Sequence, residues 1–239
     1  TVDSVKNLME GMVIDVYDTS DMIVSNLTGV RIISIDRAKK EITLSASASS
    51  VLGEGYKIYV QNSKDNELTG LEAIFGTANL YGLDRNDYSF LNPYKVTDTT
   101  GVSTEAIQAA IDSIEEVAGG AIDFIVSSYK VRRAYIEYLS LNRTNLDYMN
   151  LDGGFKALSY SGIPFVADRF VDDKTMYLLN TSDFKLHQLC DWRWIEGEGG
   201  TVLHQVANKA VYTATLVKYA DLLCERPMGQ AKITFSTIA

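Results

Sequence analysis

Two histidines and two cysteines are the residue types in this sequence that could hold a transition metal. His187 and Cys190 are close together, and His204 and Cys224 follow at larger spacings. Zinc sites use such nitrogen and sulfur ligands in a tetrahedral set. The run 184–195 reads as a β-strand, however, and positions three apart on a strand face opposite sides, so His187 and Cys190 cannot meet at one ion without a bulge. The sequence therefore favours a partly exposed histidine and a buried cysteine, with no metal and no activated thiol.

Carboxylates and glycines offer two further candidates for chemistry. Asp168, Asp172 and Asp173 could form an acid and base pair. The last two lie in a segment typical of a turn between strands, however, and acidic residues are common in such a solvated loop. The run Gly197–Thr201 resembles a phosphate loop but lacks the Lys-Ser/Thr ending and the following helix, so a hairpin turn is the better interpretation. We expect no catalytic residues and no cofactor, and hence a protein that is not an enzyme.

Aromatic residues are the remaining group that could act at a site. Trp192 and Trp194 are two apart, so on a strand they share one face with Cys190. Such a stripe either packs in a core or anchors an interface, because aromatic residues are favoured at both. Four residues are predicted as interface or core anchors: Trp192, Trp194, Tyr177 and Pro164.

The composition limits the partners that this chain can have. Its 239 residues include 22 Lys and Arg against 31 Asp and Glu, a formal charge of -9. This charge repels the phosphate backbone, so nucleic-acid binding is a poor first hypothesis. No stretch approaches the roughly 18 apolar residues of a membrane span, and we expect no membrane contact. Because the first residue is Thr1, we also expect part of the N-terminus to be missing.

The first third of the chain reads as short strands. Residues 12–17, 29–36, 41–45 and 56–60 are rich in β-branched and aromatic side chains, and the second and third form a predicted hairpin. Four or five such strands would make a small barrel or sandwich. The strand spacing stops near residue 70, where we place a domain boundary, and an irregular loop extends to Pro93.

Helices and longer strands follow. Ser103 is a predicted N-cap, and Gly119 and Gly120 end that helix, whose inward face is Ile107, Ala110, Ile111, Ile114 and Val117. A short buried strand over 121–126 precedes a second helix capped by Ser127 or Ser128, with Val131, Ala134, Tyr135, Tyr138 and Leu139 inward. Strands are predicted at 165–167, 176–179, 184–195, 210–223 and 231–237. The segment 210–223 would also suit a helix, but its neighbours favour a strand.

Several ordered motifs resemble one known family. The segments Leu158–Asp168, Met176–Asn180 and Phe184–Leu186, together with Glu67–Phe75 and Ile122–Tyr135, are similar to segments of the major capsid proteins of tailed bacteriophages and prophages. The resemblance implies an α+β, Hong Kong ninety-seven-like phage capsid fold, with an axial domain of a central sheet and flanking helices and with long peripheral-domain strands. It also implies that the family's N-terminal arm, extended loop and spine helix precede this sequence.

The resemblance implies an organisation and a function. Residues 1–70 would be a β-rich barrel-like element, 71–183 an axial-type α+β domain, and 184–239 long strands returning to a peripheral-type domain. The protein would be a structural major capsid protein that assembles with copies of itself, as pentamers and hexamers, into the icosahedral head of a phage or prophage. Its partners would include a scaffolding protein, a maturation protease and a portal, and assembly would occur in the bacterial host cytoplasm.

Alternative functions remain open. The same fold would serve an encapsulin-like compartment shell, and another virion or tailocin structural protein is a further candidate. From a different class, a β-rich carbohydrate-binding or hydrolytic protein would show exposed tryptophans beside two close carboxylates. The surroundings of Trp192 and Trp194 therefore discriminate between these interpretations.

Overall fold

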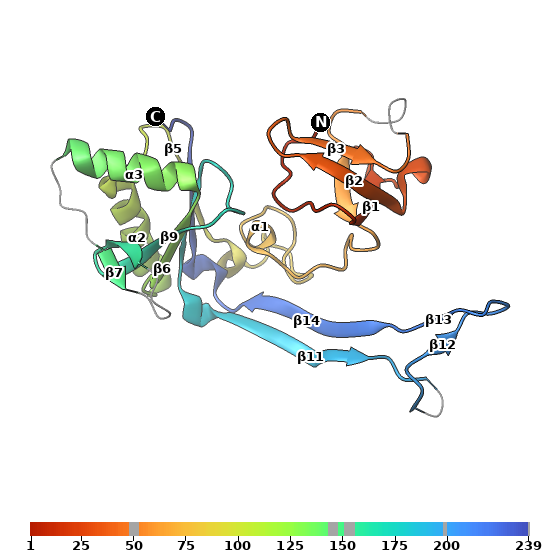
Figure 1. The fold of residues 1–239 in the computed structure, drawn as a ribbon. Helices are drawn as coiled ribbons and strands as arrows, with labels where there is room; N and C mark the ends of the chain where they lie inside the picture. Colours follow the sequence, from red (N-terminus) through yellow and green to blue (C-terminus); the bar gives the residue numbers. More distant parts are fainter. Residues whose placement is uncertain (48–52, 143–147, 151–155, 198–199, 239) are drawn as a thin grey trace. The chain divides into compact units, whose positions relative to one another are not determined.

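The protein divides into two compact units. The structure, a computed structural model, describes residues 1–47, 53–142, 148–150, 156–197 and 200–238. The first unit is Thr1–Glu67 and the second is Leu68–Ala239. Figure 1 traces both along the chain. Each unit has its own buried core, so the two are described separately.

The first unit is a small antiparallel sheet. Its strands are β1 (Val13–Tyr17), β2 (Val30–Asp36), β3 (Glu41–Leu44) and β4 (Lys57–Val60), in the order β3-β2-β1-β4. The predicted hairpin is confirmed, since β2 pairs with β3 around a charged tip. Its core is formed by Ile14, Val16, Leu27, Val30 and Ile32. No ladder between the described residues joins β3 to β4, so these strands form an open sheet.

A buried carboxylate connects the turns of the first unit. Asp15 is 2% exposed and sits in the central strand β1. Its Oδ1 accepts hydrogen bonds of 2.8 Å from the Thr28 hydroxyl and the Gly29 N–H, and its Oδ2 accepts one of 3.0 Å from the Asn62 N–H. Burial acts to raise the pKa of Asp15, but these hydrogen bonds to the ionised form outweigh it, so the pKa is lowered.

The second unit is built on a mixed sheet of seven strands. The order is β5-β15-β10-β6-β9-β8-β7. The strands are β5 (Tyr94–Asp98), β6 (Phe124–Ser127), β7 (Tyr148–Asn150), β8 (Lys156–Tyr160), β9 (Ile163–Ala167), β10 (Thr175–Leu179) and β15 (Ala231–Phe235). The β15/β5 and β6/β9 pairs are parallel, and the others are antiparallel. The predicted strands at 165–167, 176–179 and 231–237 are thus confirmed within a few residues.

Two helices cover one face of this sheet. They are α2 (Thr104–Ala118) and α3 (Tyr129–Leu141), whose buried residues pack with those of the sheet in one cluster. The Ser103 and Ser128 side chains cap them by accepting hydrogen bonds from backbone N–H groups, and Gly119 ends α2 in the left-handed conformation at φ 62°. These predictions are confirmed, as is the inward face of α3.

The prediction for Val117 is wrong. Val117 is 67% exposed, although it was placed on the inward face of α2. Ile114 is buried, and the next inward position is taken by Ala118, which packs against the core one residue later. In a helix of 3.6 residues per turn, both the third and the fourth residue after an inward position approach the core, and here the fourth does so.

A loop covers the other face of the sheet. Residues 71–92 contain α1 (Leu71–Ile74) and the 3-10 turn η2 (Ser89–Leu91). Four of their side chains form a second core with Tyr177, Leu179 and Cys224, namely Ile74, Phe75, Leu80 and Leu91. Alternate residues of β10 therefore pack into different cores. Met176 and Leu178 lie in the core beneath the helices, and Tyr177 and Leu179 lie in the core beneath the loop. All five residues of β10 are buried for this reason.

Arg85 holds this loop together from the inside. The residue is 5% exposed, and its guanidinium donates to the carbonyl oxygens of Ala78 at 2.7 Å, Ala73 and Ile74 at 2.9 Å, and Leu91. These carbonyls come from both ends of the loop. A guanidinium has five donors in a fixed plane, so it can satisfy carbonyls that no helix or strand would pair.

The Asp15 contacts predict a pH-dependent loss of stability in the first unit. The D15N variant places an amide donor against a backbone N–H and should lower the local stability of β1 by about 2 kcal/mol at neutral pH. Because the folded pKa lies below the unfolded value of about 3.9, the wild-type advantage is complete above that pH and disappears as the pH falls through the folded pKa. Hydrogen exchange of the β1 amides measures the stability difference between wild type and D15N, and the D3N variant, at an exposed position, is the control. A difference that does not change with pH would contradict an ionised Asp15 as the source of the stability.

The Arg85 contacts predict a large effect on the second unit. The R85M variant keeps the length of the side chain but removes the guanidinium donor from the buried carbonyls of Ile74 and Leu91, so we expect a loss of about 3 kcal/mol in the free energy of unfolding. Urea unfolding followed by circular dichroism measures this loss. The matched control is R133M, at an exposed position of α3. Equal stability of the two variants would show that the buried guanidinium does not organise the loop.

Candidate assembly interface

A long two-stranded ribbon leaves and re-enters the seven-stranded sheet. Strand β11 (Phe184–Trp194) follows β10, pairs with antiparallel β14 (Leu216–Cys224), and β14 leads back to β15. Figure 1 shows the two strands running side by side as a separate sheet. Short strands β12 (His204–Gln205) and β13 (Tyr212–Thr213) pair near its far end. The predicted strand 184–195 is confirmed; of the predicted strand 210–223, the part from Leu216 belongs to the ribbon.

The ribbon and the segment between its two strands expose an unusual number of large apolar side chains. Ten such residues between positions 186 and 219 are at least 40% exposed: Leu186, Leu189, Trp192, Trp194, Ile195, Leu203, Val211, Tyr212, Leu216 and Tyr219. Leu189 reaches 88%. Two strands alone bury little and are only marginally stable in water, and exposed apolar side chains in such number are typical of an interaction surface.

The ribbon carries two irregularities of register. They lie between Gln188 and Cys190 and between Cys190 and Arg193. Trp194 pairs with Leu216, whereas Cys190 pairs with Tyr219. Residues 216 and 219 are an odd number apart on β14, so they face opposite sides, and residues paired across strands share a face. The predicted stripe of Cys190, Trp192 and Trp194 is therefore wrong for Cys190, because bulges move it to the other face.

Charges on the ribbon are paired near the tryptophans. The Lys218 ammonium lies 2.9 Å from Asp191 Oδ1 and 6.0 Å from the ring centre of Trp192. The pKa of Asp191 is lowered, chiefly by the hydrogen bond from Lys218 and next by the hydrogen bond from the Trp192 N–H. Asp191 is thus an ionised partner of Lys218 rather than a proton donor.

A polar network fixes the point where the ribbon joins the sheet. Asp183 ends the 3-10 turn η3 (Thr181–Asp183) before β11, and Arg226 precedes η5 (Pro227–Gly229) after β14. The Asp183 Oδ2 accepts from Arg226 Nε at 3.2 Å and from Gln230 Nε2 at 3.0 Å. Gln230 is fully buried, and its Oε1 accepts from the Asn180 N–H at 2.8 Å. The network thus joins both ends of the ribbon to the end of β10.

The loop over residues 71–92 and Thr69 just before it also contact the end of β14 that joins the sheet. The Tyr81 hydroxyl donates to the Leu222 carbonyl at 3.0 Å and accepts from the Cys224 N–H at 2.8 Å. Thr69 donates its N–H and hydroxyl to the two carboxylate oxygens of Asp221. Burial acts to raise the pKa of Asp221, but the Thr69 hydrogen bonds lower it overall. The polar residues of these contacts were not predicted, because their partners are distant in sequence.

The other predicted residues lie apart from one another. Tyr177 is in the core beneath the loop, where burial raises its pKa to about 12, and Pro164 is half-buried in β9. His187 is exposed and His204 half-buried. Burial raises the pKa of the Cys224 thiol to about 11, so it is protonated and not a nucleophile. Within the described residues no three His, Cys, Asp or Glu side chains gather as metal ligands.

The predicted turns show no catalytic arrangement. Asp172 and Asp173 lie in the loop between β9 and β10, where Asp173 Oδ2 is 2.6 Å from the Lys130 ammonium. In the glycine run, Glu198 and Gly199 lie outside the described residues, but the Gly197 N–H donates to the Thr201 carbonyl, as in a turn. In the part of the chain that the structure describes, no helix is long and apolar enough to cross a membrane.

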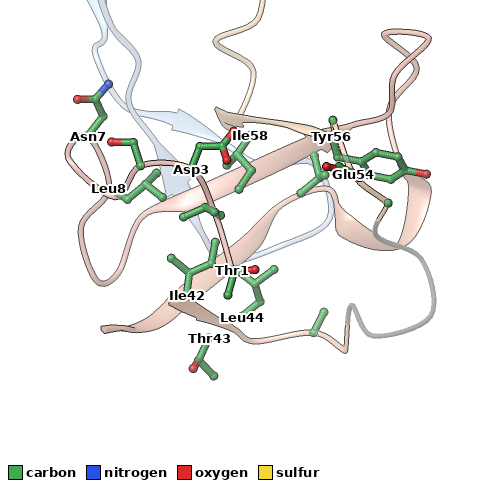
Figure 2. Close-up of a pocket in the computed structure, with 16 residues that line it drawn as sticks. Thr1, Asp3, Asn7, Leu8, Ile42, Thr43, Leu44, Glu54, Tyr56 and Ile58 are labelled. Atoms are coloured by element: carbon green, nitrogen blue, oxygen red, sulfur yellow. The ribbon is translucent and has the colours of Figure 1, made fainter. Parts of the chain in front are cut away.

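A hollow of about 1260 Å³ lies in the first unit. Residues of the segment Thr1–Leu8 border it, together with Ile42 and Leu44 of β3, Tyr56 just before β4, and Ile58 of β4 (Figure 2). Asp3 and Glu54 are the carboxylates in its lining, and no histidine or cysteine joins them. The lining mixes polar side chains with apolar ones from the sheet, and among its described residues no nucleophile is arranged with a histidine base.

Comparison with known proteins supports one fold. The chain is similar to the capsid asymmetric unit of cyanophage A-1(L), with a TM-score of 0.51 and 15% identity over 70% of this chain and 60% of that chain. Weaker similarities are to an encapsulin complex from Synechococcus elongatus PCC 7942 (TM-score 0.43, 14% identity, 63% and 57% covered) and to the major capsid and decoration proteins of phage G (0.36, 11%, 68% and 57%). No protein family and no curated protein sequence matches the chain.

The first similarity establishes the fold. The chain has the α+β, Hong Kong ninety-seven-like fold of a phage capsid subunit, as the sequence motifs predicted. It spans 60% of the length of the cyanophage capsid protein. The identity of 15% is too low to transfer the role of any single residue.

The base of the ribbon gives a further prediction. Replacing Gln230 by leucine keeps the bulk of the side chain but leaves the Asn180 N–H and Asp183 Oδ2 without this partner, so the free energy of unfolding should fall by about 2 kcal/mol. Hydrogen exchange should also quicken first at the ends of β11 and β14 that join the sheet. The Q205L variant, at an exposed position of β12, is the control. If both variants unfold alike, the network does not fix the ribbon.

Proposed function

We propose that this chain is the shell-forming part of a major capsid protein, which assembles with copies of itself into the head of a tailed phage or prophage. The capsid fold supports the proposal, and the observation that carries it is the ribbon β11/β14, with its large exposed apolar side chains and two unpaired edges. Strand edges and apolar faces of this size are satisfied by neighbouring chains.

The proposal assigns a mechanical role to each part of the second unit. The sheet, closed by cores on both faces, is a rigid body, and the Asp183–Arg226–Gln230 network holds the ribbon to it. A neighbour that covers the ribbon would bury the two tryptophans, which suit the centre of an interface because they bring large area at low entropic cost. No chemical step is needed, and we propose that the protein is not an enzyme.

The remaining partners and the location belong to the same proposal. A subunit of this kind would meet a scaffolding protein, a maturation protease and a portal, and would assemble in the cytoplasm of a bacterial host before residing in the virion. The charge of -9 supports only non-specific contact with packaged DNA. The axial-type domain over 71–183 and the peripheral-type strands over 184–239 remain our division of the chain.

An encapsulin-like compartment or another virion or tailocin component would use the same ribbon. The arrangement of subunits and the contents of the particle separate these alternatives. The carbohydrate-binding or hydrolytic alternative has one observation in its favour, the exposure of Trp192 at 64% and Trp194 at 50%. The pairing of Asp191 with Lys218 weakens it, because this carboxylate next to Trp192 already forms an ion pair.

Assembly of the full-length gene product tests the proposal. Light scattering and negative-stain microscopy over a range of salt and pH should reveal shells, rings or open sheets. The chain has two tryptophans, both on the ribbon, so their fluorescence should shift to shorter wavelength as particles form. A protein that stays monomeric under all conditions, with tryptophan emission at the long wavelength of solvent-exposed rings, would overturn the proposal. A shift of this emission to shorter wavelength on adding oligosaccharides would favour the carbohydrate-binding alternative.

Matched variants identify the surface responsible. The W194E variant places a charge on the ribbon and should raise the concentration needed for assembly about 30-fold, the effect of a lost interface anchor of about 2 kcal/mol. The V117E variant makes a similar change at an exposed apolar residue of α2 and is the control. Both should fold with the same circular dichroism spectrum. Equal assembly of the two variants would remove the ribbon from the interface.

A further inference from the structure

Two exposed surfaces of the second unit, apart from the ribbon, have complementary character. The first, the acidic loop, is residues 83–90, in which Leu83, Asp87, Tyr88 and Phe90 are exposed. The rings of Tyr88 and Phe90 are 5.8 Å apart. Because Arg85 of the same loop is turned inward to backbone carbonyls, the charge that the loop presents to solvent is that of its aspartates.

The acidic loop is held in one shape by its own contacts. Asp84 Oδ1 accepts from the Asn86 backbone and side chain, and the Asn92 side chain donates to the Arg85 carbonyl. With the guanidinium of Arg85 at its centre, the loop has little conformational freedom to lose on binding. Rigid aromatic residues on such a loop are suited to act as interface anchors.

The second surface, the basic patch, lies at the start of α3. It consists of Tyr129, Arg132, Arg133, Arg169 and Phe170. Arg132 stacks 5.2 Å from the Tyr129 ring centre, and Arg169 stacks 4.8 Å from that of Phe170. Tyr129 is 48% and Phe170 59% exposed. The Nε of Arg132 is buried without a hydrogen-bond partner among the described residues.

The positive charge that the basic patch offers to a partner is that of Arg133, because Asp168, Asp172 and Asp173 lie in the same loop as Arg169. Asp173 is paired with Lys130 at 2.6 Å, and Asp168 Oδ1 accepts from the Phe170 N–H at 2.7 Å. The exposed Arg133 has no ion pair with the described residues. The patch therefore presents the exposed Arg133 together with aromatic rings, which complements the exposed Asp87 and the aromatic rings of the acidic loop.

The strand register places the two surfaces at opposite ends of the sheet. Leu178 pairs with Ala231, which pairs with Tyr94, so the end of β10 lies beside the start of β5, which directly follows the acidic loop. Ser127 pairs with Met176 and Ala167, so the basic patch lies where β6 and β9 end and β10 begins. The strands of five residues separate these ends by about 15 Å.

We infer that the acidic loop of one copy binds the basic patch of the next copy, head to tail. The inference rests on the proposed self-assembly. The two surfaces stand at opposite ends of the sheet. Each copy can therefore place its acidic loop on one neighbour and accept the acidic loop of another neighbour on its basic patch. Such heterologous contacts form rings when the rotation between copies closes. Nucleic acid is a weaker occupant of the patch, since three arginines on a chain of charge -9 give few phosphate contacts.

Charge reversal with mixing tests this contact. The D87R and R133D variants should each need roughly tenfold higher concentration than wild type to assemble, measured by sedimentation velocity. The 1:1 mixture should regain most of the wild-type assembly, because in alternating order Arg at position 87 meets Asp at position 133 and the native pair also forms. A ring with an odd number of subunits keeps one mismatched contact. The double variant should likewise recover, but should not assemble together with wild type.

Controls and contrary outcomes are distinct. The E116R and K40D variants carry the same charge changes at exposed positions outside both surfaces and should assemble normally. If wild type assembles but the single variants do so equally well, or if mixing restores nothing, the head-to-tail contact is refuted while the proposed function stands. If D87R assembles normally and R133D only loses binding to a single-stranded oligonucleotide, the patch binds nucleic acid instead. A wild type that never assembles refutes both proposals.

Discussion

The second unit depends on the burial of one strand from both sides. All five residues of β10 are buried, and alternate ones face different cores. A strand of this kind needs cover on both faces of its sheet. The helices α2 and α3 supply one cover through ordinary amphipathic packing. The other cover is an irregular loop, which can exist as a packed layer only because its backbone polar groups are satisfied, and Arg85 provides much of that satisfaction.

The parts that the sequence predicted are those with local signals. The caps at Ser103 and Ser128 and the glycine that ends α2 depend on neighbouring residues, and they are confirmed. The fold was predicted from an ordered series of motifs. Val117 shows the limit of a periodic pattern, since two successive positions can point toward a core and only packing decides between them. The face of Cys190 could not be predicted because bulges depend on the partner strand.

The candidate interface was predicted only in part. Trp192 and Trp194 were identified as anchors, but the sequence left open whether they are buried, and in the chain by itself they are exposed. The residues that hold the ribbon, Asp183, Arg226 and Gln230, are far apart in sequence and carry no pattern. The order within 71–92 was also missed, because it comes from a side chain bonding to carbonyls rather than from periodicity. Long-range polar contacts are thus what the sequence concealed.

The two bulges of β11 have a consequence for the life of the free subunit. A long, flat strand with open edges accepts any other strand and so favours irregular aggregation. Bulges bend and twist a strand, so the edge of this ribbon fits only a partner with a matching curve. In the proposed assembly, this curvature would limit pairing of the uncovered ribbon with strands of the wrong shape before a matching neighbour covers it.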